Sequence, residues 1–100
     1  MPYLICYDIE SNTLRTKVAQ KILQTGLERV NRSVYIGAPT DADMAQLENY
    51  LQVLMASVGQ ANDSLIVLPI TTHQVYQMRV FGHNEWTAAA LVGDAHTVLL

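Results

Sequence analysis

The sequence predicts one small α+β domain, and three observations lead to this prediction. A chain of 100 residues has the length of a single domain. Half of the residues are apolar and 15% are charged, which is typical of a globular protein. Segments with the two-residue period of strands are interspersed with segments that have the 3.6-residue period of helices.

The composition also excludes several classes of protein. The apolar runs are much shorter than the ~20 residues that a membrane helix requires, so no membrane partner is expected. The N-terminus lacks the pattern of a signal peptide, and the single cysteine cannot form an intramolecular disulfide. We therefore expect a cytoplasmic protein. So high an apolar fraction in so short a chain also favours an oligomer.

The first predicted element is a central strand over residues 3–9. Its apolar side chains lie on both faces: Tyr3, Ile5, Tyr7 and Ile9 on one face, Leu4 and Cys6 on the other. A strand that is apolar on both faces is covered on both sides, so Tyr7 is expected in the core. Asp8 places a carboxylate at the end of this strand.

A helix is predicted over residues 13–25. Ser11 or Asn12 can cap its start, and Gly26 suits the position after its last turn. Arg15 lies in the first turn, where a cation opposes the helix dipole. We therefore expect the Arg15 side chain to bind a group outside the helix.

The remaining elements follow in the order strand, helix, strand, strand. Residues 27–37 are predicted to be extended, either as one bent strand or as two short ones. A second helix begins at a variant capping box that starts at Thr40, and it ends at Gly59. Strands are predicted over residues 64–68 and 75–81.

The order β-α-β-β-α-β predicts a ferredoxin-like sandwich with an extra C-terminal strand and both helices on one face of the sheet. The other face is also apolar, and a symmetric homodimer would bury it. Residues 1–82 are assigned to this domain and 83–100 to a C-terminal tail. We expect the tail to dock on a partner protein. The alternative is that it folds back over the helices of its own domain around Trp86.

The charges of the chain are segregated. Residues 11–40 carry five cations and one acid, whereas the rest of the chain carries one cation and eight acids. The five cations are Arg15, Lys17, Lys21, Arg29 and Arg32. Clustered lysine and arginine attract phosphates, so these residues are candidates for nucleic-acid binding. Ser33 could hydrogen-bond a phosphate or a strand edge. The plain alternatives are a solvated helix face for the cations and a turn residue for Asp8.

Four segments in register resemble the CRISPR-associated Cas-two (Cas2) family of small dimers that partner the Cas-one (Cas1) integrase during spacer acquisition. These segments are Tyr7-Asp8-Ile9, Arg15-Thr16-Lys17-Val18-Ala19, Ser33-Val34-Tyr35-Ile36-Gly37 and Asp63-Ser64-Leu65-Ile66-Val67-Leu68-Pro69-Ile70. Together they extend over about residues 3–82.

The resemblance implies a ferredoxin-like dimer in which two strand-end aspartates approach the two-fold axis. In nuclease-active members these aspartates hold a divalent metal, usually magnesium, for phosphodiester hydrolysis. The matching residue here is Asp8, which is thus the candidate catalytic residue and metal ligand. Two carboxylates provide few protein ligands, so the implied magnesium site is weak.

The chain departs from the family pattern in two places. The family often has two adjacent arginines after the aspartate, where this chain has Arg15 and Lys17. Tyr35 stands where phenylalanine is more usual, and Ile36 replaces an acid that often follows. These departures affect the catalytic prediction more than the fold.

Three functions remain open from the sequence. The first is a DNA-binding adaptor in the CRISPR integration complex, with weak or absent metal-dependent endonuclease activity. The second is a toxin-type endoribonuclease of the virulence-associated protein D kind, which shares the fold and the strand-end aspartate. The third is a regulatory module that binds a small molecule at its dimer interface. The cluster of cations argues against the third, because such a module needs no surface for phosphates.

Overall fold

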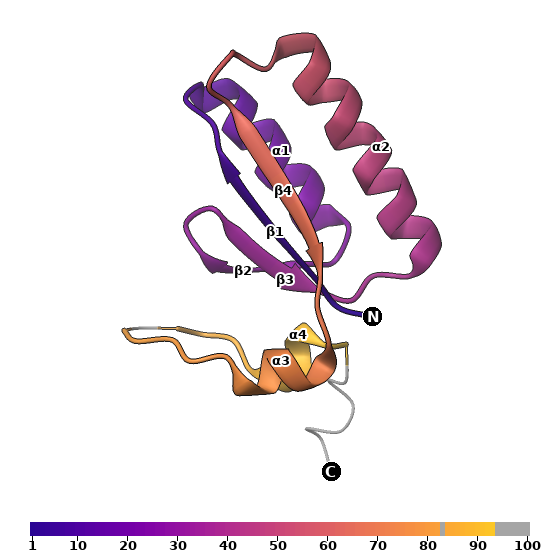
Figure 1. Ribbon diagram of the computed structural model, residues 1–100, viewed down its shortest axis with the longest axis vertical. Helices are drawn as coiled ribbons and strands as arrows, with labels where there is room; N and C mark the ends of the chain where they lie inside the picture. Colours follow the sequence, from indigo (N-terminus) through magenta and orange to yellow (C-terminus); the bar gives the residue numbers. More distant parts are fainter. Residues whose placement is uncertain (83, 94–100) are drawn as a thin grey trace.

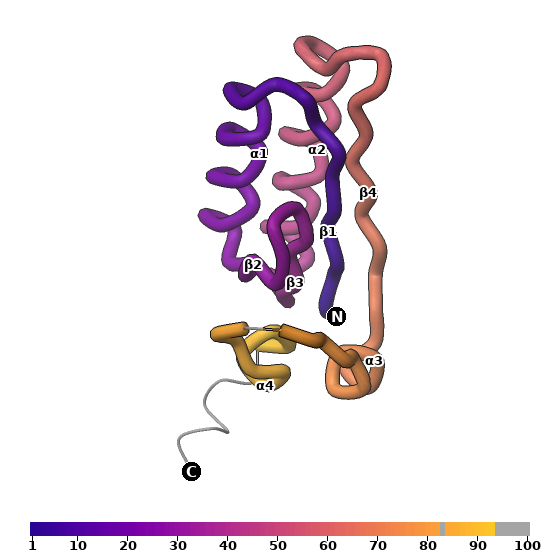
Figure 2. Tube along the Cα trace, turned by 90° about the vertical axis from the view of Figure 1, so that its left-hand side faces the viewer, coloured from indigo at the N-terminus to yellow at the C-terminus, as the bar shows by residue number. Residues whose placement is uncertain are grey.

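The computed structural model describes residues 1–82 and 84–93 of the chain. Its sheet has four antiparallel strands in the order β2-β3-β1-β4. The strands are β1 (Tyr3–Asp8), β2 (Glu28–Asn31), β3 (Val34–Gly37) and β4 (Ser64–Pro69). Helices α1 (Asn12–Gln24) and α2 (Asp41–Val58) lie side by side on one face of the sheet (Figures 1 and 2). The α+β class and the ferredoxin-like order are confirmed.

Local signals in the sequence fix the ends of the two long helices. The side chain of Ser11 accepts a hydrogen bond from Leu14 N at 3.3 Å, and that of Thr40 accepts one from Asp43 N at 3.1 Å. Each bond satisfies a backbone donor that the first turn of the helix leaves free. Gly26 follows α1 with a φ of +105°, which a residue with a side chain rarely adopts. The predicted caps are confirmed.

The main core lies between the sheet and the two long helices. Tyr3, Ile5 and Tyr7 of β1 face the helices, as their alternation predicted. They pack with buried side chains from β3 and both helices: Leu14, Val18, Ala19, Ile22, Tyr35, Met44, Leu47 and Leu51. This core holds the end of β1, α1 and the β2–β3 hairpin in fixed relative positions.

Residues 27–37 form two strands rather than one bent strand. β2 and β3 are joined by a tight turn at Arg32 and Ser33. Their register shifts between Arg29 and Asn31, so the hairpin is irregular next to the turn. Two of the candidate cations, Arg29 and Arg32, lie at this irregularity.

The strand expected over 75–81 is not formed in the described chain. Helix α3 (Thr72–Gln77) occupies its first half, and Met78 then continues with extended backbone outside the sheet. Thr71 caps α3 in a complete capping box with Gln74. The alternation of 75–81 suggested a strand, but the cap and the burial of Val75 favour a helix at its start.

A second, smaller cluster lies at the end of the sheet where β4 leaves it. Helix α4 (Ala88–Leu91) and α3 lie next to each other below this end of the sheet (Figures 1 and 2). Buried Ile36, Val75 and Leu91 pack there together with Leu4 and Trp86. The described part of the tail therefore packs on its own domain, against α3 and β3, and not over α1 and α2 as the fold-back alternative stated. Residues 94–100 lie outside the described residues, and partner docking by them stays a prediction.

We expect Leu91→Ala to lower the free energy of unfolding by about 2–4 kcal/mol. Leu91 is 0% exposed, and its loss would leave a cavity against Ile36 and Val75. Urea denaturation followed by circular dichroism measures the change. Leu68→Ala is the matched control, because Leu68 is 50% exposed. Equal effects of the two substitutions would show that α4 does not contribute to the core.

The other face of β1 and β4 stays open beyond this cluster. Ile66 and Leu68 of β4 point to this face and are 56% and 50% exposed. They stand opposite Cys6 and Leu4 of β1 in the ladder. The apolar second face that the sequence predicted is therefore present. None of the helices formed by residues 1–82 and 84–93 has the length and apolarity to span a membrane.

Candidate nucleic-acid interface

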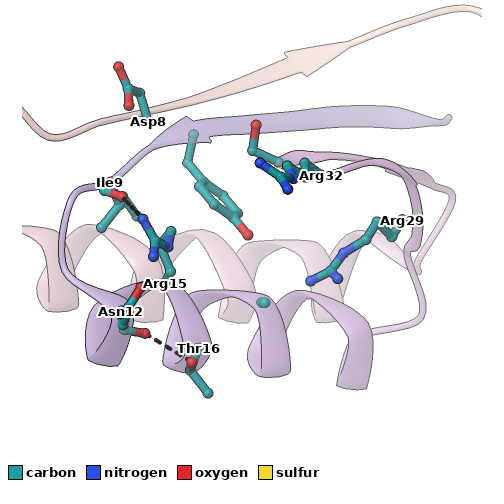
Figure 3. A pocket seen from close by; sticks show the side chains of 10 residues that line it. Asp8, Ile9, Asn12, Arg15, Thr16, Arg29 and Arg32 are labelled. Atoms are coloured by element: carbon teal, nitrogen blue, oxygen red, sulfur yellow. Dashed lines mark hydrogen bonds between the residues drawn. The ribbon is translucent and has the colours of Figure 1, made fainter.

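A cavity of about 640 Å³ lies between the end of β1, the start of α1 and the β2–β3 hairpin. We call it the arginine groove. Its lining residues are Tyr7, Asp8, Ile9, Asn12, Arg15, Thr16, Ala19, Arg29, Arg32 and Ser33. Four of the predicted nucleic-acid-binding residues, Arg15, Arg29, Arg32 and Ser33, are thus brought together from a helix, a strand and a turn (Figure 3).

Backbone carbonyl groups at the end of β1 hold Arg15. Its Nη1 atom donates hydrogen bonds to the carbonyl oxygens of Ile9 at 3.0 Å and Glu10 at 3.2 Å. The guanidinium therefore reaches out of α1 toward β1, as its unfavourable place in the first helical turn suggested. These partners are neutral, so the positive charge of Arg15 remains available to an anion.

Arg29 reaches the groove from β2 and is held by Tyr35. Its Nε and Nη2 atoms donate to the Tyr35 hydroxyl at 3.1 and 2.7 Å, and the guanidinium lies 5.3 Å from the centre of the tyrosine ring. The hydrogen bond to Tyr35 raises the pKa of Arg29. A cation held by a phenol keeps its full charge, which suits it to bind phosphate.

Tyr7 forms part of the groove as well as of the core. Its hydroxyl is 3.0 Å from that of Tyr35. Burial raises the pKa of Tyr7 to about 12, and the hydrogen bond to Tyr35 acts in the same direction. Tyr7 is therefore a neutral phenol at physiological pH. The sequence assigned it to the core alone, and only the placement of β1 beside Tyr35 shows its second contact.

Lys17 and Lys21 lie outside the arginine groove. Lys21 faces α2, where its Nζ atom is 5.1 Å from the centre of the Tyr50 ring. Lys17 is exposed on α1, two positions after Arg15, and residues two apart on a helix do not share a face. The five cations predicted as one surface therefore divide into a groove of three arginines and two separate lysines.

Two residues of the groove were not singled out from the sequence. Asn12 and Thr16 lie one turn apart on α1, on the side that faces the groove. The Thr16 hydroxyl donates to the Asn12 carbonyl oxygen at 2.9 Å (Figure 3). Their spacing in the sequence could have predicted this position. Asn12, Arg15 and Thr16 stand at i, i+3 and i+4, so they share one face of the helix.

Asp8 is exposed and points to the opposite side of β1 from Arg15 and Arg29 (Figure 3). It follows Tyr7, and successive side chains of a strand alternate between its two faces. Asp8 pairs with Ser64 of β4, on the same side as the exposed Ile66. Asp8 is therefore one of the lining residues of the groove, but its carboxylate points away from the arginine cluster.

Asp8 is not part of a cluster of possible metal ligands in the described part of the chain. In the described residues, no group of three or more histidine, cysteine, aspartate or glutamate side chains could hold a metal ion. Magnesium needs near-octahedral coordination by oxygen atoms, and one exposed carboxylate supplies little of it. A magnesium site at Asp8 would therefore need further oxygen ligands besides this carboxylate.

Comparisons with known proteins agree with this fold. The sequence matches the family model of CRISPR associated protein Cas2 over residues 1–78. It is 31% identical over 85 residues to CRISPR-associated endoribonuclease Cas2 1 of Francisella tularensis subsp. novicida, covering 85% of this chain and 84% of that protein. It is 39% identical over 66 residues to the CRISPR-associated endoribonuclease Cas2 of Aeropyrum pernix, covering 66% of this chain and 71% of that one.

Solved structures also match this chain in fold. The crystal structure of a hypothetical protein TT1823 from Thermus thermophilus matches with a TM-score of 0.67 and 28% identity, over 85% of this chain and 94% of that one. Streptococcus pyogenes Cas2 matches in fold with a TM-score of 0.69 and 20% identity, over 82% of this chain and all of that one.

Fold and sequence together define a small ferredoxin-like protein with a CRISPR-associated nuclease or adaptation role. The chain belongs to the CRISPR-associated protein Cas2 family.

Proposed function

We propose that this chain is a dimeric, DNA-binding adaptor in the CRISPR spacer acquisition complex, where it works beside the Cas1 integrase. The observation that carries this proposal is that the phosphate-binding candidates and the candidate metal ligand point in different directions. Three arginines converge in one groove, while the carboxylate of Asp8, at the end of β1, points to the other side of this strand. One chain therefore has the cations to hold a phosphate backbone, whereas residues 1–82 and 84–93 contain no group of three or more possible metal ligands.

The open face of β1 and β4 supports a homodimer. Ile66 and Leu68 expose apolar surface there, and a second copy would bury it. Asp8 lies on the same face, so a two-fold axis near it would bring the two copies of Asp8 together. The pair could then share a magnesium ion or another divalent cation and give the dimer a weak endonuclease activity. Asp8 would supply carboxylate oxygens to that metal.

A second candidate function is RNA cleavage. The relatives from Francisella and Aeropyrum are named endoribonucleases, and they share the family of this chain. A free-standing endoribonuclease of the virulence-associated protein D kind would act without Cas1. Both candidate functions would use the arginine groove to bind phosphates. They differ in whether Cas1 is required and in whether the product is an integrated spacer or cleaved RNA. Binding assays with DNA and with RNA would measure which of the two the groove binds more tightly.

Reconstitution with Cas1 tests the proposed function. The purified chain is mixed with Cas1 from the same organism, a protospacer duplex and a plasmid that carries a repeat array. We expect a stable complex and integration of the duplex only when both proteins are present. Integration by Cas1 alone at the same rate, together with cleavage of RNA by this chain alone, would favour the second candidate.

Nucleic-acid binding should depend strongly on salt. If the three arginines of the groove each neutralise one phosphate, the log-log salt slope on duplex DNA is about −3 per subunit. Substitution of Arg15 or Arg32 by Ala should reduce this slope by about one. Lys21→Gln is the matched control and should have a smaller effect, because Lys21 lies against Tyr50 outside the groove. Fluorescence anisotropy at several salt concentrations measures the slopes, and equal slopes for all variants would contradict the groove.

A further inference from the structure

The Tyr35 hydroxyl lies at the centre of a polar chain beside the arginine groove. It contacts Arg29 through Nε and Nη2, at 3.1 and 2.7 Å, and the Tyr7 hydroxyl at 3.0 Å. The three side chains come from β2, β3 and β1. Arg29 and Tyr35 are directly paired in the β2–β3 ladder, and Tyr35 is fully buried. The positions of these polar atoms are therefore fixed by the sheet itself.

The number of donors sets the direction of these hydrogen bonds at neutral pH. A guanidinium has only donors, and a phenol oxygen accepts at most two hydrogen bonds while it donates one. The two N–H groups of Arg29 use both acceptor positions of Tyr35. Tyr35 must then donate its own proton to the oxygen of Tyr7. The proton of Tyr7 is left for a further acceptor.

Tyr7 is in place to offer that proton to a ligand. It lines the arginine groove together with Arg15 and Arg29, and the charges of both arginines act on its phenol. Hydrogen bonds in a chain polarise one another, so the cation at one end strengthens the donor at the other. The groove therefore has a hydroxyl donor between two guanidinium groups, which is a favourable arrangement for a phosphate oxygen.

We propose that Tyr35 is a positioning residue for a backbone phosphate: its hydroxyl fixes the Arg29 guanidinium and directs the Tyr7 O–H into the groove. This inference rests on the proposed nucleic-acid binding. An unrestrained arginine loses side-chain entropy when it binds a phosphate, whereas Arg29 is ordered before the ligand arrives. A carboxylate could order it equally well but would cancel its charge. A neutral phenol orders the cation and leaves the charge to the ligand.

Tyr35→Phe tests the inference because it removes one oxygen and keeps the ring on which Arg29 lies. With a labelled DNA duplex of about 20 base pairs, we expect a salt slope close to that of the wild type, because no cation is lost. The affinity should fall about three- to tenfold, because the phosphate loses oriented donors. Tyr50→Phe, which removes the hydroxyl beside Lys21 outside the groove, is the matched control and should change neither quantity.

A double-mutant cycle separates positioning from a general effect on the fold. In an Arg29→Ala background, Tyr35→Phe should cost clearly less affinity than it does alone, because the cation it positions is absent. Additive losses of affinity would overturn the inference.

The outcomes distinguish this inference from the proposed function. If Arg29→Ala binds the duplex as tightly as the wild type, the groove is not the nucleic-acid site and both fail. If Arg29→Ala weakens binding but Tyr35→Phe does not, only the positioning role fails. Should Tyr35→Phe not fold, Tyr7→Phe decides: a folded Tyr7→Phe protein with unchanged affinity overturns the inference, and a several-fold loss at unchanged salt slope supports it.

Discussion

Asp8→Asn is expected to reduce any metal-dependent hydrolysis of phosphodiesters to the level of the metal-free control. Asparagine has nearly the same shape as aspartate but lacks the negative charge that a hard divalent cation requires. Asp8 is exposed at the end of β1, so its substitution leaves the core intact. Cleavage of labelled RNA and DNA with magnesium, and with a chelator in its place, measures the effect.

Spacer capture with Cas1 should persist in the same Asp8→Asn variant. The adaptor role depends on the arginines of the groove and on the dimer, and the Asp8 carboxylate points to the opposite side of β1 from Arg15 and Arg29. Asp41→Asn is the matched control, since Asp41 is an exposed acid at the start of α2. If a folded Asp8→Asn dimer loses spacer capture, the nuclease becomes the primary function and the ranking proposed above is reversed.

Ile66→Asp is expected to convert the dimer to a monomer that still folds. Ile66 is 56% exposed in the single chain, so a carboxylate there costs the isolated domain little. In a dimer formed through this face, the two-fold axis would bury both new charges without a partner. The dissociation constant should rise by at least about 100-fold, which corresponds to roughly 3 kcal/mol.

Analytical ultracentrifugation across a dilution series measures this change. Val53→Asp is the matched control, because Val53 is an exposed valine of similar exposure, 57%, on α2 and away from the open face. We expect Val53→Asp to sediment like the wild type. An Ile66→Asp protein that remains a dimer at low concentration would show that the subunits meet through another surface, and the pairing of the two Asp8 residues would then have no basis.

The sequence by itself determined the order of the elements from β1 to β4 and which side chains of β1 share a face. These features depend on signals within a few residues: the Ser11 and Thr40 caps, Gly26 after α1, and the alternation of Tyr3, Ile5 and Tyr7. The segregation of charge was also visible, because it needs only counting along the chain. Local physical chemistry was sufficient wherever the interacting groups are neighbours in sequence.

Local signals were misleading where two of them competed. Tyr76, Met78 and Val80 alternate like the residues of a strand, yet Thr71 and Gln74 form a capping box that begins a helix. An edge strand also needs a partner for its backbone groups, and the single chain offers none to 78–81 among the described residues. The position of the tail also could not be predicted from neighbouring residues. Leu91 is buried through packing with Ile36 and Val75, which are distant from it in the sequence.

Only the tertiary structure decided which cations form a site. Arg15 and Arg29 come from a helix and a strand, and the arginine groove exists because the core packs α1 against the sheet. The same packing turns Lys21 toward Tyr50 and leaves Lys17 in solvent. The Tyr7–Tyr35 contact joins residues 28 positions apart in the chain. Contacts of this kind depend on how strands register in the sheet, and no pattern of neighbouring residues specifies them.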